Sequence, residues 1–166
     1  FKLGDIKYPT VIKEITTDND LKQWEYLEEF HYRTHSNLIT DENSKKTSFG
    51  GGRTSVLILY IEIGKKKVAA GYIELAQSLL MVGPRKNVFE QSFNHPKFDI
   101  NFERWDQNSI SKYANRITRI SRIVVHPTYR GIGLTKPLIL AAKNYAIERW
   151  NLSRKKPVFI EILAEM

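Results

Sequence analysis

The segment from Arg122 to Thr135 constrains the fold more than any other part of the chain. It reads Arg-Ile-Val-Val-His-Pro-Thr-Tyr-Arg-Gly-Ile-Gly-Leu-Thr. The β-branched residues before Pro127 predict a strand over 117–125, which the proline ends because it has no N–H to donate to a sheet. A helix is predicted to begin near Thr135, since apolar residues then recur at helical spacing, at Leu138, Ala141, Ala142 and Tyr145. The chain must therefore accommodate a strand, a glycine-containing turn and a helix in succession.

The turn between this strand and helix has the composition of a phosphate-binding loop. Gly131 and Gly133 let backbone N–H groups face one point without a Cβ in the way. The start of a helix adds unpaired N–H donors and partial positive charge, and Arg130 adds a cation. The pattern is neither a P-loop, which needs Gly-Lys-Ser/Thr, nor a dinucleotide fingerprint, which needs a third glycine and a later acid. Two glycines alone are equally compatible with a plain strand-to-helix turn.

The rest of the chain predicts a mixed α/β (α+β) domain. A strand is expected at 11–16, then a helix capped by Thr17 or Asp18 that carries Leu21, Trp24, Leu27 and Phe30 on one face. Two strands, 55–63 and 68–75, flank the turn at 64–67, and a last strand is expected at 158–163. Between them, 77–116 shows no sustained period and is predicted to be an insertion with one or two short helices. We expect one domain over 1–166.

Composition restricts the chemistry of the chain. Apolar residues make up 42% and charged residues 27%, as in ordinary globular proteins. The absence of cysteine excludes disulfides and thiolate metal sites, and is compatible with a reducing compartment, so we expect a cytoplasmic location. No apolar run approaches the roughly 20 residues of a membrane helix, and no contact with a membrane is expected. The N-terminus does not resemble a signal peptide and lacks a methionine, which suggests a fragment of a longer chain.

The net charge of +8 favours polyanionic partners. Nucleic acid, an anionic membrane surface and a phosphorylated cofactor all fit that charge. A lysine-rich solvated surface explains it equally well.

The full string from Val125 to Thr135 resembles motif A of the GNAT acyltransferase superfamily. That motif is Arg/Gln-x-x-Gly-x-Gly/Ala after a strand ending in Val-x-Pro, and here it reads Arg130-x-x-Gly133-x-Thr135, with threonine in place of the usual small residue. The resemblance covers 117–146 and implies a mostly antiparallel mixed sheet flanked by helices. It also implies that acetyl-CoA or another acyl-CoA is the cofactor. The residues implied to bind it are Ile123, Val124 and Val125 along the pantetheine, and Arg130, Gly131, Ile132, Gly133, Leu134 and Thr135 around the pyrophosphate.

A narrower resemblance connects the chain to two groups of this superfamily. Phe30-His31-Tyr32-Arg33, the string from Arg119 to Pro127 and the last nine residues look like GNAT domains fused to archaeal ABC-type ATPases, and distantly like phage Mom-type DNA-modifying enzymes. The family continues beyond its strand at 158–163 with a helix and a hairpin, which this chain lacks. Other domains of a longer polypeptide are therefore expected partners.

Three residues are candidates for catalysis. Glu161 is a charge on an otherwise apolar strand, where burial would favour its protonated form and make it a plausible base; a structural salt bridge is the alternative. His31 could act as a base and Tyr32 could orient the acceptor, and their alternative is packing at a helix end. Glu74, on the predicted hairpin, is a candidate base for the same reason as Glu161, with less support from the sequence. No metal site is expected.

The resemblance to GNAT acyltransferases implies an acyl-CoA-dependent N-acyltransferase that transfers an acyl group to an unknown amine. Direct attack is expected, because no cysteine can carry the acyl group. One alternative is a DNA- or tRNA-modifying enzyme of the same fold, which would make nucleic acid a partner. The other is a non-catalytic CoA-sensing or docking domain of a larger ATPase.

Overall fold

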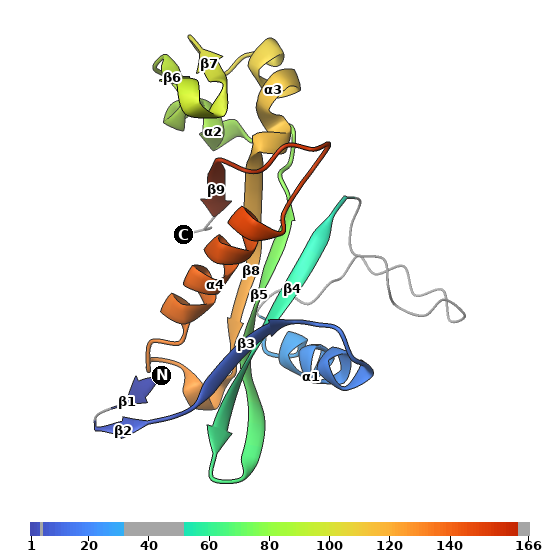
Figure 1. The fold of residues 1–166 in the computed structure, drawn as a ribbon, viewed down its shortest axis with the longest axis vertical. Coiled ribbons are helices and arrows are strands. Elements are labelled where there is room, and N and C mark those ends of the chain that lie inside the picture. Colours follow the sequence, from blue (N-terminus) through green and yellow to red (C-terminus); the bar gives the residue numbers. More distant parts are fainter. Residues whose placement is uncertain (4, 32–51, 163–166) are drawn as a thin grey trace. The chain divides into compact units, whose positions relative to one another are not determined.

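A computed structural model describes residues 1–3, 5–31 and 52–162 of the chain (Figure 1). Within these residues the chain forms two compact units. The first contains the residues up to Ala76 together with Ile120–Lys143, and the second contains Gln77–Arg119 and the residues from Asn144 onward.

The first unit is built on antiparallel strands. Strand β3 pairs with β4, and β4 pairs with β5 through the hairpin turn at Gly64. Hydrogen bonds join the main sheet in the order β3-β4-β5-β8-β9, and β1 and β2 form a separate pair. The prediction of a mixed α/β class, with a mostly antiparallel sheet flanked by helices, is confirmed (Figure 1). The elements that begin in this unit are β1 (Lys2–Leu3), β2 (Ile6–Lys7), β3 (Thr10–Glu14), α1 (Asp18–Glu28), β4 (Thr54–Ile63), β5 (Lys66–Gln77), the 3-10 turn η3 (Pro127–Tyr129) and α4 (Thr135–Glu148).

The core of the first unit lies between α1 and the sheet. Leu27, on α1, has no exposed surface, and Trp24 and Phe30 pack beside it against the strands, as their three-residue spacing predicts. Burying a side chain of that size contributes roughly 1.5–3 kcal/mol. The sheet side of this core consists of Val56, Ile58, Tyr60, Ala69, Tyr72 and Val124.

The N-terminus of α1 is fixed by Asp20, which is 2% exposed. Its carboxylate accepts hydrogen bonds from Lys13 Nζ at 2.7 Å and from the Tyr60 hydroxyl at 2.7 Å. The Thr17 side chain caps the helix by accepting from the Asp20 N–H, which confirms one of the two predicted caps. Burial alone would raise the pKa of Asp20, but the hydrogen bonds from Lys13, Tyr60, Thr17 and Thr16 outweigh burial and hold that pKa far below its usual value.

Asp20→Asn is expected to lower the free energy of unfolding by about 2–3 kcal/mol at neutral pH, because a buried ion pair loses its charge. A carboxyl with a depressed pKa contributes stability above its unfolded pKa and loses that contribution as pH falls through the folded pKa. The difference between the two proteins should therefore be full at neutral pH and shrink below about pH 4. Urea unfolding at several pH values measures it. Asp18→Asn, in the same helical turn but exposed, is the control, and an equal loss there would attribute the effect to helix charge alone.

The second unit contains the segment 77–116, in which the sequence shows no sustained hydrophobic period. One or two short helices were predicted there and two are present, α2 and α3, but the β6–β7 hairpin was not predicted, because three-residue strands show no usable alternation. Strand β9 was expected at 158–163 and begins one residue later, at Phe159; residue 163 lies outside the described residues. The elements of this unit are α2 (Gly83–Val88), β6 (Phe93–His95), η1 (Pro96–Phe98), β7 (Ile100–Phe102), α3 (Gln107–Tyr113), η2 (Ala114–Arg116), the start of β8 (Ile117–Val125) and β9 (Phe159–Ile162).

An aromatic cluster forms the core of the second unit. Phe102 and Trp105 are each 5% exposed, with ring centroids 5.3 Å apart. Phe89 contacts both rings and also Phe159 on β9. The cluster explains how 77–119 and the residues around β9 hold together. Across the described residues, the helices are too short or too polar to cross a membrane.

Candidate functional site

The loop between β8 and α4 has the conformation that its glycines predict. Gly131 and Gly133 have φ values of +79° and +90°, in the region that residues with a Cβ rarely adopt. A Cβ placed on either glycine would meet no atom within 4 Å, so the loop borders open space. Gly133 and Leu134 supply the first carbonyl acceptors of α4, to Lys136 and Leu138. Positive φ, open space and a helix start together fit the binding of a phosphate group.

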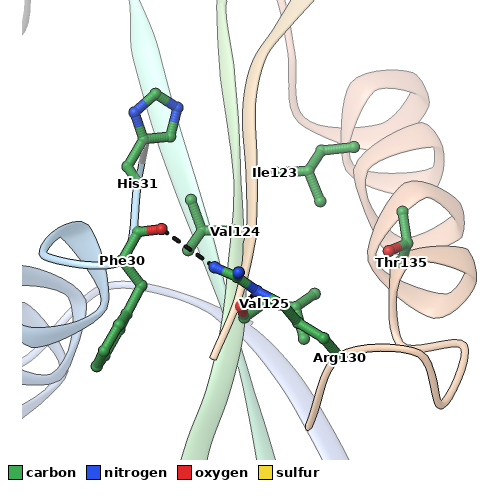
Figure 2. A pocket seen from close by; sticks show the side chains of 7 residues that line it. All are labelled: Phe30, His31, Ile123, Val124, Val125, Arg130 and Thr135. Carbon is green, nitrogen blue, oxygen red and sulfur yellow. Dashed lines mark hydrogen bonds between the residues drawn. The ribbon is translucent and has the colours of Figure 1, made fainter. Parts of the chain in front are cut away.

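A pocket of about 390 Å³ lies beside this loop in the first unit (Figure 2). That volume is in the range of small-molecule sites. Residues from three separate parts of the chain line it: Phe30, His31, Ile123, Val124, Val125, Arg130 and Thr135. The sequence predicted six of these seven as site residues. Phe30 was assigned to the helix face only, although it stands next to His31 in the Phe-His-Tyr-Arg string.

Of the predicted cofactor residues, Ile123, Val124 and Val125 line the pocket from β8, Thr135 from the start of α4, and Arg130 from the loop between them. Ile132 is half-buried and Leu134 is 1% exposed, so the Leu134 side chain belongs to the core. Any ligand contact at Leu134 would therefore be made by its backbone. Gly131 and Gly133 are exposed.

Arg130 spans the mouth of the pocket. Its Nε donates to the Val125 carbonyl at 3.1 Å and its guanidinium also donates to the Phe30 carbonyl at 3.2 Å (Figure 2). A guanidinium has five N–H donors in a planar fork, so these two bonds leave others for an anion. Arg130 thus ties the end of α1 to the end of β8 and places a cation at the pocket.

The edge of β8 at the pocket is set by its contact with β5. The β4–β5 pairing shifts register between Leu59 and Tyr60, which leaves Ala70 as an extra residue on β5. The Ala70 carbonyl accepts from the His126 N–H at 2.9 Å. Alternate peptide groups of a strand point to opposite sides, so the Ile123 and Val125 groups point away from β5. The bond from Arg130 to the Val125 carbonyl agrees with this direction. Because Ile123 and Val125 also line the pocket, a ligand bound there can approach the same side of β8.

The pocket wall opposite β8 is held by contacts at the end of α1. The Glu28 carboxylate accepts from Arg122 at 2.8 Å and from the Tyr72 hydroxyl, which joins α1 to β8 and β5. The Phe30 ring packs edge-on against His126 with centroids 4.6 Å apart. These contacts fix the backbone that carries Phe30 and His31.

His126 was not predicted as part of this site, although it sits in the Val-His-Pro string. Its Nδ1 accepts from the Thr128 N–H at 3.3 Å, which leaves Nε2 to donate to the Tyr26 hydroxyl at 3.1 Å. The His126 ring also contacts Tyr129. His126 therefore acts here as a packing and hydrogen-bonding residue behind Phe30.

The predicted catalytic residues have different surroundings. His31 lines the pocket, whereas Tyr32 lies outside the described residues. Glu161 lies in the second unit, where its carboxylate accepts from Arg85 Nε at 3.0 Å and from the Ser78 hydroxyl at 2.7 Å. Arg85 is 4% exposed and also donates to the Leu79 carbonyl. Such contacts are those of a structural salt bridge, the alternative considered for Glu161.

Glu74 is a second buried carboxylate of the first unit, besides Asp20. It is 8% exposed, lies on β5 opposite Val56 and accepts from the Ser121 hydroxyl on β8 at 2.6 Å. The Ser121 hydroxyl is also within hydrogen-bond distance of the Glu74 carbonyl, at 3.2 Å. Glu74 therefore couples β5 to β8 on the strand segment that precedes the pocket.

No protein-family model matches this chain, and no curated protein matches its sequence. The resemblance to GNAT acyltransferases therefore rests on the residues of the chain itself, and above all on the segment from Ile117 to Ala146.

Proposed function

We propose that this chain is an acyl-CoA-dependent N-acyltransferase, with acetyl-CoA as the first cofactor to test. The observation that carries the proposal is the pocket, where an outward-facing strand edge, a glycine loop with positive φ and a helix start converge. A pantetheine arm has amide groups that can pair with a strand edge. A pyrophosphate suits the loop, where Arg130 adds positive charge.

The transfer itself follows from ordinary thioester chemistry. The amine nitrogen attacks the thioester carbonyl, the C–N bond forms, the C–S bond breaks and the thiolate of CoA leaves. The proton lost by the amine needs an acceptor, and among the described residues that line the pocket His31 has a side chain that can take it. Holding both reactants in one site supplies much of the rate enhancement. The chain contains no cysteine to form an acyl-enzyme, so attack is direct.

Calorimetric titration of acetyl-CoA and CoA tests the cofactor assignment. Binding in the micromolar range is expected for both ligands, and turnover is then sought with a panel of amines. If neither ligand binds to this chain or to the longest natural polypeptide that contains it, the proposal is wrong.

Arg130→Ala should weaken CoA binding by about 10- to 150-fold, because a charge-assisted hydrogen bond to a phosphate is worth roughly 1.5–3 kcal/mol. The same titration measures the change. Arg104→Ala removes an exposed arginine of the second unit and should leave the affinity unchanged. Equal affinities in the wild type and Arg130→Ala would remove Arg130 from the binding site.

A further inference from the structure

Three segments of the second unit, which the proposed function does not use, form one connected surface. The Arg116 guanidinium donates to the Lys156 carbonyl at 3.3 Å and to the Phe98 carbonyl at 3.1 Å. Lys155 Nζ lies 3.4 Å from the Lys112 carbonyl. These bonds connect 97–99, 112–116 and 153–156 through backbone groups, so the relative positions of the segments are defined within the unit.

This surface is strongly basic. Its three segments carry a single acid, Asp99. The pKa of Lys112 is raised, first by its side-chain hydrogen bond with Tyr113 and more weakly by the negative charge of Asp99. Arg116 is half-buried and the other cations are exposed. The six basic residues are Lys97, Lys112, Arg116, Arg154, Lys155 and Lys156.

The turn beside three of these cations is closed by backbone hydrogen bonds. Ser153 and Arg154 have φ values of +52° and +62°, which residues other than glycine adopt infrequently. Leu152 and Lys155 exchange backbone hydrogen bonds at 3.1 and 2.9 Å and so close the turn. The turn thus has a defined conformation next to three consecutive exposed cations, Arg154, Lys155 and Lys156.

An aromatic ring lies within the basic surface. Phe98 is 38% exposed, and its ring lies 4.6 Å from the His95 ring. Lys97 Nζ is 5.9 Å from the centre of the same ring. Exposed aromatic rings beside cations bind nucleic acids by stacking on bases while the cations bind the phosphates.

We propose that this surface, formed by 97–99, 112–116 and 153–156, binds single-stranded nucleic acid. The cations bind successive phosphates and Phe98 stacks on an unpaired base. A duplex offers the same phosphates but no free base face, so single strands should bind more tightly. The proposal stands independently of acyl transfer, because none of these residues belongs to the pocket.

Fluorescence anisotropy with labelled 15-nucleotide oligo(dT) and oligo(U), and with a matched duplex, tests the proposal. Binding should weaken steeply between 50 and 200 mM salt, with a log–log slope of roughly 0.7 per phosphate neutralised. The double variant Lys155→Glu and Lys156→Glu should lower the slope by about 1.4 and the affinity at low salt by at least about tenfold. The control is the double variant Lys65→Glu and Lys66→Glu, at the turn and at the first residue of β5. It makes an equal change of charge on exposed residues of the first unit and should change the affinity less than about twofold.

Phe98→Ala distinguishes stacking from simple attraction of charge. It should weaken oligonucleotide binding about fivefold or more, while binding of heparin, a polyanion without bases, stays unchanged. Circular dichroism and thermal unfolding identify variants that fail to fold. The proposal is overturned if no oligonucleotide binds at low salt, if the two charge-reversed variants lose affinity equally, or if the duplex binds as tightly as the single strands.

Discussion

Gly133→Glu is expected to abolish measurable CoA binding while leaving the fold intact. The substitution places a negative charge and a long side chain where the pyrophosphate would lie, and like charges repel strongly in a partly enclosed site. It also forces a residue with a Cβ to φ +90°, so the N–H groups of the loop would turn away from the ligand. We expect a loss of affinity of at least about 100-fold, equivalent to about 2.8 kcal/mol. Calorimetric titration of CoA measures this loss.

Gly64→Glu is the matched control for this experiment. Gly64 also has a positive φ, of +62°, and a Cβ there also meets no atom within 4 Å, but the residue lies in the β4–β5 turn. Both variants should therefore pay a similar backbone cost, about 1–2 kcal/mol in the free energy of unfolding. Only the Gly133 variant should lose CoA. Wild-type affinity in Gly133→Glu would place the ligand elsewhere and remove the main support for acyl transfer.

The elements that the sequence predicted well are those whose signals are local. Pro127 marks the end of β8 to within two residues, and the apolar spacing after Thr135 marks α4. Thr17 as a cap and Gly131 and Gly133 as positive-φ positions follow from the chemistry of single residues. The pocket collects residues that were predicted from a resemblance, but a sequence alone gives no distance between His31 and Val125.

The features that were missed depend on contacts between distant parts of the chain. A salt bridge was considered for Glu161, but its partner Arg85 lies 76 residues earlier and no local pattern identifies it. The hairpin of β6 and β7 forms because its aromatic residues join a shared core, not because of strand propensity. The extra residue at Ala70 is visible only once the register of β4 against β5 is known.

Gly71→Ala is expected to disturb the pocket by displacing β8, without replacing any residue that lines it. A Cβ on Gly71 would lie 2.6 Å from the Val124 carbonyl oxygen and 3.3 Å from the Val125 Cα. Because both atoms belong to backbone, β5 and β8 must move apart. Overpacking of this kind costs about 1–3 kcal/mol in the free energy of unfolding. The displaced segment is the one that lines the pocket, so CoA affinity should fall by about tenfold or more as well.

Gly83→Ala provides the comparison, since a Cβ on Gly83 meets no atom within 4 Å and the residue lies in the second unit. It should leave both stability and CoA affinity close to wild type. Urea unfolding and calorimetric titration of the same preparations separate the two effects of Gly71→Ala. Lost stability with unchanged affinity would show that β8 is structural and that the ligand does not pair with it. Loss of both would show that the close approach of Gly71 to Val124, next to the register shift at Ala70, positions the edge of β8. That edge is where the proposed cofactor would bind.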